Sequence, residues 1–384
     1  MKYVLSKIKS YFVNMDKLLL LLCTGICAFG VFIHYTLYQN DISGDVTDSQ
    51  YKTQLVAAVV GLVAALIIAA INYKFIAKLW YIYAPVSLGM TLLLFTSLGV
   101  QRQGADDIGW LDLGIMQFQP SEVLKLAFIL SFAWHLSKVE DRMNEPLHFI
   151  LLCIHGAVPT LIIRQTGDDG SAMVFLFIFF CMMFAAGLSW KYMVLFAAAV
   201  PPAIYVLWNY LMQPHQRQRF EILWNTELQE QEAIGAYMQQ RLGKIALGSG
   251  GLTGQGLSGG NYTYVPEIHN DFIFSYIGMT MGLLGCMLVV GLLAALAIKV
   301  LSDGSTAKDT LGRLICVGVF SMIVFHSAVN IGMVLGIAPV IGIPLPFFSA
   351  GGTSTVSLFV GIGMVLSVNS HNMRKYHMFY SEAD

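Results

Sequence analysis

Residues 18–38 read LLLLLCTGICAFGVFIHYTLY and contain no Asp, Glu, Lys or Arg. A helix rises about 1.5 Å per residue, so this run can cross the roughly 30 Å hydrocarbon core of a bilayer. The run is too long for the apolar part of a signal peptide, and no A-x-A cleavage site follows it. We therefore interpret it as a first membrane span.

Comparable apolar runs recur along the chain. Apolar residues make up 56% of the sequence and charged residues 12%, about half the charge of a soluble domain. Backbone groups find no water in the bilayer core, so the runs must be helices. The sequence predicts one all-α, polytopic transmembrane domain over residues 1–384. Its ten transmembrane helices are expected near residues 17–39, 53–72, 75–99, 120–138, 148–165, 170–188, 190–212, 271–300, 310–338 and 351–369.

The distribution of Lys and Arg predicts the orientation. With the N-terminus inside, the inside segments hold fourteen of these residues and the outside segments seven, which favours cytoplasmic N- and C-termini. The longest extracytoplasmic loop then covers residues 213–270, and a connection of that length calls for a functional explanation. The net charge of −1 and the absence of a basic patch argue against nucleic-acid binding.

The segment FQPSEVLK at residues 118–125 places two charges at the start of the fourth expected span. Pro120 suits the first turn of a helix, because its missing N–H costs nothing there. Glu122 and Lys125 are three residues apart and share a helix face. Pairing lowers the cost of a lone charge in the bilayer, roughly 2.5–3.5 kcal/mol. A structural ion pair and the polar wall of a substrate cavity both fit.

The long loop contains the glycine-rich run GSGGLTGQGLSGG at residues 248–260. It includes a GxGxxG match, but no strand–turn–helix unit surrounds it, so we reject a dinucleotide site. Glycine N–H groups can approach an anion such as a lipid-linked phosphate closely. A merely flexible loop fits the run equally well.

The same loop ends in VPEIHNDF at residues 265–272, which gathers three ionisable side chains at the start of the eighth expected span. Asp271 can act simply as a helix cap, because the helix dipole favours a carboxylate there. The position also suits a general base, since it is polar and lies at the water interface. Glu267 and His269 are the neighbouring candidates for substrate contact.

Three other segments carry polar residues within or between spans. His326 and Asn330 are four residues apart on one helix face, and we favour an interhelical hydrogen bond for them. The Pro- and Gly-containing stretch 339–354 predicts an irregular loop that lines protein or a cavity. In residues 166–171, Asp168 or Asp169 is expected to cap the sixth helix. No metal site is predicted, because no His/Cys ligand spacing is present.

Together these motifs resemble the SEDS family (shape, elongation, division and sporulation; RodA, FtsW and SpoVE), and its RodA branch more than its FtsW branch. The matching segments are residues 110–114, 118–125, 248–256, 266–274 and 330–333, followed by 339–349. They span most of the chain in the family's order. The family's ten spans with both termini inside agree with the spans counted from hydropathy.

The resemblance implies a peptidoglycan glycosyltransferase in the bacterial cytoplasmic membrane. Its substrate would be lipid II, the undecaprenyl-diphosphate-linked disaccharide-pentapeptide, polymerised at the outer face. A class B penicillin-binding protein would be its transpeptidase partner. The family's proposed catalytic aspartate maps onto Asp271, with Asn270 where the family has Thr.

The resemblance also suggests how the substrate is held. Arg217, Arg219, Arg241 or Lys244 would stabilise the leaving diphosphate, and a divalent cation is an alternative. The candidate substrate contacts are Trp110, Glu122, Lys125, Asp168, Arg217, Arg219, Glu267, His269, Asn330 and Ser349.

Three departures from the family pattern limit this transfer. The family's Gly-Ala-x-Arg-Trp run reads GADDIGW at residues 104–110, without the arginine. The family's Gln-Pro-Asp-x-Gly-Thr reads TGDDGS at 166–171, which keeps Asp168 if Gly170 is the anchor. The family's Gly-Glu-Glu reads Gly278-Met-Thr280, without a carboxylate. Roles attached to the absent charges cannot be carried over.

Two other functions remain open. A flippase for lipid-linked precursors would use the polar residues within the spans as a path, but repeated broken helices in corresponding halves are not evident. A non-catalytic scaffold for the penicillin-binding protein would tolerate replacement of Asp271. An assay for glycan strands made from lipid II separates all three.

Overall fold

The computed structural model describes residues 15–380 except residues 41, 43–47, 102–106, 113, 115–116 and 232–235. The Gly104–Ala105 pair and part of the 110–114 motif therefore lie outside the described residues. The described chain is predominantly helical.

Helices occur at each of the ten expected positions. They are α2 (Lys17–Asn40), α3 (Asp48–Ala70), α4 (Tyr73–Lys78) with α5 (Trp80–Leu92) and η1 (Leu93–Phe95), α6 (Pro120–Lys138), α7 (Pro146–Gln165), α8 (Asp169–Ala185), α9 (Trp190–Val206) with η3 (Leu207–Leu211), α13 (Ile273–Ser305), α14 (Thr310–Leu335) and α15 (Gly352–Tyr380). Seven helices of the described chain are long and apolar enough to cross a membrane. A multi-pass membrane protein follows from them.

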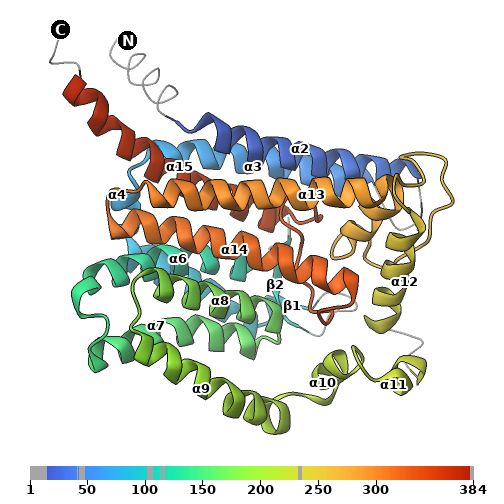
Figure 1. The fold of residues 1–384 in the computed structure, drawn as a ribbon, viewed down its shortest axis with the longest axis horizontal. Helices are drawn as coiled ribbons and strands as arrows, with labels where there is room; N and C mark the ends of the chain where they lie inside the picture. The colour runs from blue at the N-terminus through green and yellow to red at the C-terminus, as the bar shows by residue number, and fades with distance from the viewer. Residues whose placement is uncertain are drawn as a thin grey trace.

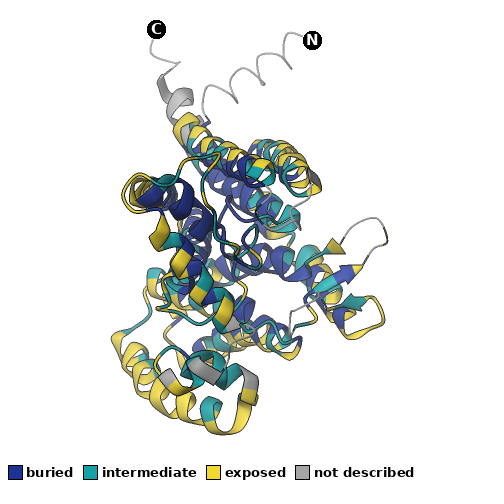
Figure 2. Ribbon diagram, turned by 90° about the vertical axis from the view of Figure 1, so that its right-hand side faces the viewer, coloured by how far each residue is buried: buried dark blue, intermediate teal, exposed yellow. Residues whose placement is uncertain are grey.

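The long helices form a bundle with their axes roughly parallel (Figure 1). α2 begins and α15 ends at one end of the bundle, whereas α12 (Ala236–Ser249) stands at the opposite end. α3 and α15 pack closely, because Gly61 lies against Phe359 and Gly363 against the backbone of Ala65. Figure 2 shows buried residues concentrated in the upper and middle bundle and exposed residues on the lowest helices.

A small antiparallel sheet precedes α6 and was not predicted from the sequence. Its strands are β1 (Gly99–Val100), β2 (Trp110–Asp112) and β3 (Gln117–Phe118), in the order β1-β2-β3. Leu111 of β2 pairs with Gly99 on one side and Phe118 on the other. The sheet delivers the chain to Pro120, the first residue of α6, where the sequence placed it.

The described part of the 213–270 segment contains three helices, α10 (Pro214–Glu221), α11 (Thr226–Gln231) and α12. The glycine-rich run follows α12 and packs against α13, which is broken at Gly282 (φ 65°, ψ −162°). The N–H groups of Gln255 and Gly256 donate to the carbonyls of Met279 and Thr280, both at 3.0 Å.

The same glycine-rich segment also accepts hydrogen bonds from the backbone N–H groups that follow the break at Gly282. The Leu283 and Leu284 N–H groups donate to the carbonyls of Gly251 (2.9 Å) and Leu252 (3.2 Å). Irregular backbone is tolerated inside a membrane protein only where its polar groups find partners. The glycine-rich run therefore supplies the hydrogen bonds that α13 loses at Gly282, and it leads the chain toward Asp271.

Candidate functional site

Asp271 lies in a tight turn immediately before α13. The N–H groups of Asn270 (3.0 Å) and Phe272 (3.4 Å) donate to the carbonyl of Glu267, which has a positive φ of 55°. Asn270 also donates its side-chain amide to Glu267 Oε2 at 2.6 Å. A strained non-glycine residue of this kind persists only where its surroundings enforce it, and such residues cluster at functional sites. The turn holds the half-buried Asp271 at the end of the bundle.

The irregular loop between α14 and α15 lies directly beside this turn. The Ala350 N–H donates to the His269 carbonyl at 2.9 Å, and the Ser349 hydroxyl donates to the Asn270 carbonyl at 2.7 Å. A Cβ atom on Gly342 would lie 3.7 Å from Asp271 Oδ2. The loop therefore forms one wall around the Asp271 carboxylate.

Helices from the first part of the chain hold the loop from behind. His34 Nε2 lies 2.7 Å from the Phe348 carbonyl, and Gln54 Nε2 lies 3.4 Å from the Phe347 carbonyl. Phe347 has a positive φ of 64°. Buried polar side chains on α2 and α3 thus fix the loop, and sequence reasoning did not find either of them.

Asn330 joins the loop to the turn. Its Nδ2 donates to the Asp271 carbonyl and to the Ile343 carbonyl, each at 2.8 Å, and its side chain is fully buried. Both partners are acceptors, so the orientation of the amide is determined. Asn330 therefore fixes the backbone of Asp271 relative to α14.

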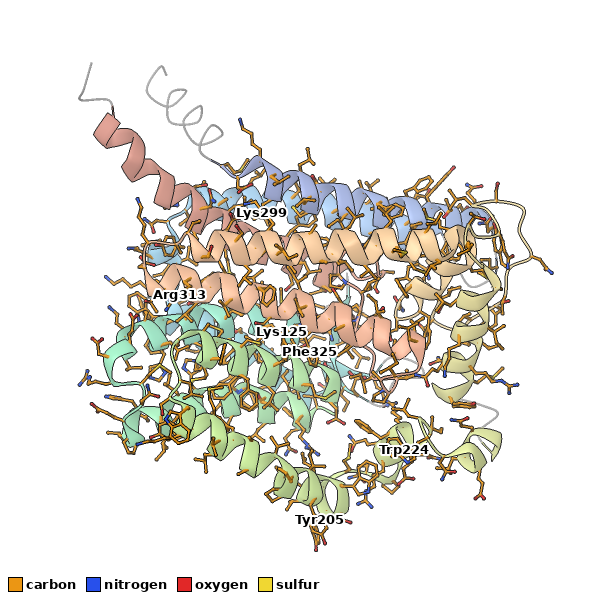
Figure 3. The ribbon with its side chains drawn as sticks, in the orientation of Figure 1. Lys125, Tyr205, Trp224, Lys299, Arg313 and Phe325 are labelled. Atoms are coloured by element: carbon orange, nitrogen blue, oxygen red, sulfur yellow. The ribbon has the colours of Figure 1, made fainter. Side chains whose placement is uncertain are left out.

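One turn further into α14 lies a buried polar group formed with α6. Lys125 Nζ donates to Glu122 Oε1 at 2.7 Å and lies 3.1 Å from His326 Nε2. The exposed fractions of Lys125, Glu122 and His326 are 1%, 3% and 6%. Figure 3 shows Lys125 in the middle of the bundle. The interhelical hydrogen bond expected for His326 is present.

The Asp168 turn faces the loop from α8. Asp168 caps α8 by accepting the Ser171 N–H at 2.8 Å. Burial raises the pKa of its carboxyl above the ordinary value, and the Ser171 hydrogen bond and the charge of Lys125 oppose that rise. A Cβ atom on Gly170 would lie 2.6 Å from the Ile341 carbonyl, so this turn touches the other side of the same loop.

Of the remaining candidate residues, some lie near the loop beside Asp271 and others lie farther from it. Arg219 Nη1 donates to the Val340 carbonyl at 3.3 Å, which brings it to the loop beside Asp271. Arg217 Nη2 instead donates to the Asn209 carbonyl at 3.0 Å, next to η3. Lys244 Nζ lies against Gly336 at the end of α14. Trp110 lies in β2, and the nearby Ile108 N–H donates to the Thr166 carbonyl at 2.9 Å, linking the sheet to the Asp168 turn.

The structure thus brings most of the predicted residues to one end of the bundle. Glu267, His269, Asp271, Asn330 and Ser349 form one hydrogen-bonded assembly, and α14 connects it to Lys125. In the described residues, no group of three or more His, Cys, Asp or Glu side chains is arranged to hold a metal ion.

A bundle of apolar helices with a carboxylate at one end and a buried ion pair beneath it defines a multi-pass membrane protein with a polar site at one end of its bundle. The particular family follows from comparison with known proteins. The family model described as "Cell cycle protein", which covers FtsW, RodA and SpoVE, matches residues 16–374. The chain belongs to this family.

Curated relatives match along nearly the whole chain. The peptidoglycan glycosyltransferase MrdB of Escherichia coli (strain K12) is 30% identical over 365 residues, covering 94% of each chain. A probable peptidoglycan glycosyltransferase FtsW of Trichlorobacter lovleyi is 29% identical over 370 residues, covering 92% of this chain and 93% of the relative.

Solved structures share the fold. A chain from a study of the structural coordination of polymerization and crosslinking by a peptidoglycan synthase complex has a TM-score of 0.77 at 26% identity, covering 93% of this chain and 98% of that one. The rod-shape-determining protein RodA of Thermus thermophilus has a TM-score of 0.67 at 25% identity, covering 92% and 96%. The bundle described above is therefore a RodA-like membrane fold.

Proposed function

We propose that this protein is a peptidoglycan glycosyltransferase that polymerises lipid II. The relatives named for this activity support the proposal, and the observation that carries it is the placement of Asp271. Its carboxylate lies beside a loop that α2, α3 and α14 hold by hydrogen bonds from buried side chains. A general base must first lie within reach of the proton that it accepts, and the fixed backbone of Asp271 in this turn supports that role.

The proposed reaction is a single displacement. Asp271 accepts the proton of the acceptor sugar's 4-hydroxyl while that oxygen attacks the anomeric carbon of the donor. The bond from this carbon to the diphosphate oxygen breaks, and the diphosphate leaves with inversion. Arg219 is better placed than Arg217 for the developing charge, because its guanidinium reaches Val340 in the loop beside Asp271.

The proposed setting is the bacterial cytoplasmic membrane, with ten spans and both termini inside. The site end of the bundle then faces outward, where lipid II is polymerised. A class B penicillin-binding protein is the proposed partner, and the structural likeness to a chain of a peptidoglycan synthase complex supports that choice. The 213–270 segment is the proposed outer loop that leads into Asp271.

The test is polymerisation of lipid II by the purified protein together with its penicillin-binding protein, with glycan strands resolved on gels. We expect Asp271→Asn to lose at least about 100-fold in rate, the range of general-base catalysis. Glu227→Gln, in the exposed part of the same long loop, is the matched control and retains wild-type rate. An Asp271→Asn protein that makes strands at near wild-type rate would exclude the base assignment. If the wild-type protein makes no glycan strands but moves lipid II across the membrane of vesicles, a flippase is favoured.

A further inference from the structure

The buried ammonium group of Lys125 has a hydrogen-bonding capacity that its ion pair does not exhaust. A lysine ammonium carries three N–H donors. Glu122 Oε1 accepts one at 2.7 Å, and His326 Nε2 lies at 3.1 Å from Nζ to accept a second. The third has no hydrogen-bond partner among the described residues. Lys125 therefore retains one donor for a ligand, and its direction is set by the other two.

The second acceptor is defined by its own hydrogen bond. His326 Nδ1 lies 2.7 Å from the carbonyl of Met322, one turn earlier in α14. A carbonyl only accepts, so Nδ1 carries the proton and the lone pair of Nε2 faces Lys125. His326 is therefore a fixed neutral acceptor at this position, and two contacts on different helices hold the ammonium group.

The same helix positions Asp271. Asn330 lies one turn beyond His326 and donates to the Asp271 carbonyl at 2.8 Å. Neither contact depends on the substrate. α14 consequently sets the distance between the Asp271 carboxylate at the end of the bundle and the Lys125 ammonium group.

We propose that His326 is a positioning residue for the glycosyltransferase reaction, which orients Lys125 so that its free N–H meets an anionic oxygen of the diphosphate as it leaves. This inference rests on the proposed function and adds a residue that acts through Lys125. Such an orientation lowers the reorganisation needed when negative charge develops on the leaving diphosphate.

A purely packing role for His326 makes a different prediction. The ring is buried beside apolar neighbours in α14, so Leu would fill its space at least as well as Gln. Positioning requires an acceptor at the place of Nε2, which the Gln side-chain oxygen reaches and Leu lacks. The comparison of His326→Gln with His326→Leu therefore separates the two roles.

The first measurement is lipid II polymerisation with the penicillin-binding protein, together with the apparent unfolding temperature in detergent. We expect His326→Leu to lower kcat by about 10- to 100-fold, since misplacement of a group by about 1 Å has effects of that order. KM should change by less than about threefold, and His326→Gln should restore kcat to within about threefold of wild type. Ser327→Ala, the next residue of α14, whose hydroxyl bonds only within its helix, is the control.

The second measurement needs no activity. Undecaprenyl diphosphate should raise the unfolding temperature of the wild type and of His326→Gln equally, and that of His326→Leu less. Equal kcat and equal ligand shifts for the Leu and Gln proteins would overturn the positioning role and leave the proposed function standing. A wild type that makes no strands but shows the expected pattern of ligand shifts would reject the polymerase and support positioning toward a diphosphate. A wild-type protein that makes no strands and shows no shift with undecaprenyl diphosphate would overturn both the proposed function and the positioning role.

Discussion

Replacing Asn330 by Leu is the sharpest test of how the site is assembled. Leu has the same number and branching of side-chain heavy atoms as Asn, so the change creates no cavity, but it removes both amide donors. The carbonyls of Asp271 and Ile343 then lose partners that lie at 2.8 Å. Asn330 is fully buried and Ile343 is 2% exposed, so water cannot readily replace the amide at Ile343.

The size of the effect follows from these two contacts. A buried polar group left without a partner costs about 1–3 kcal/mol. The Ile343 carbonyl should incur this cost in full and the half-buried Asp271 carbonyl a part of it, which gives a loss of roughly 2–4 kcal/mol in the free energy of unfolding. The loss falls on the contact that fixes Asp271, and a displacement of about 1 Å at a reacting group costs on the order of 100-fold in rate.

Unfolding would be followed by tryptophan fluorescence during titration with SDS in mixed micelles, and activity by strand synthesis from lipid II. Asn209→Leu is the matched control, because this exposed side chain donates to the Tyr205 carbonyl, one turn earlier in the chain, and has no other hydrogen bond to the described residues. It should change the free energy of unfolding by less than about 0.5 kcal/mol and leave the rate unchanged. If Asn330→Leu unfolds and polymerises like wild type, the inferred role of the two hydrogen bonds is wrong.

Two further changes probe the backbone and the pH dependence. Gly254 has a φ of +82° and packs against the Thr280 carbonyl, so Gly254→Ala should lower the free energy of unfolding by at least about 1 kcal/mol. Gly248 lies in α12 with open space around it, so Gly248→Ala should instead raise the free energy of unfolding by about 0.5–1 kcal/mol. Equal effects of the two changes would refute the packing of the glycine-rich run against α13. At the opposite end of the bundle, burial tends to raise the pKa of Asp309, but the hydrogen bond and ion pair with Lys74 (2.5 Å) bring it below its ordinary value. Because the pKa is lower in the folded state, this carboxylate stabilises the fold above the unfolded pKa of about 3.9, and the stabilisation disappears as the pH falls through the folded pKa. Lys74→Met should flatten this acid dependence of the unfolding temperature, and an unchanged profile would contradict the assignment.

The sequence by itself determined the membrane class and most helix positions. Long uncharged runs allow only helices in a bilayer, so composition and length were sufficient. Pro120 marked the start of α6, and the spacing of Glu122 and Lys125 indicated their ion pair, because both features are local to one helix. The motifs also pointed to the family and to Asp271 as the candidate base.

Other features depended on contacts between distant segments. The break at Gly282 gave no distinct signal, because a glycine in an apolar run is compatible with a continuous helix. The partner of that break, the glycine-rich run, looked equally suited to an anion or to a flexible loop. Only the fold shows that its backbone completes the hydrogen bonding of α13.

The geometry of the site was likewise decided by the tertiary structure. His34 precedes the Phe348 carbonyl that it contacts by 314 residues, and Lys125 and His326 are 201 residues apart. Local periodicity places each side chain on a helix face but cannot say which other helix that face meets. The sequence therefore determined which residues carry charge and where the chain is helical. The packing of α14 against α6 and against the loop between α14 and α15 decided that neighbouring turns of one helix hold Lys125 and Asp271.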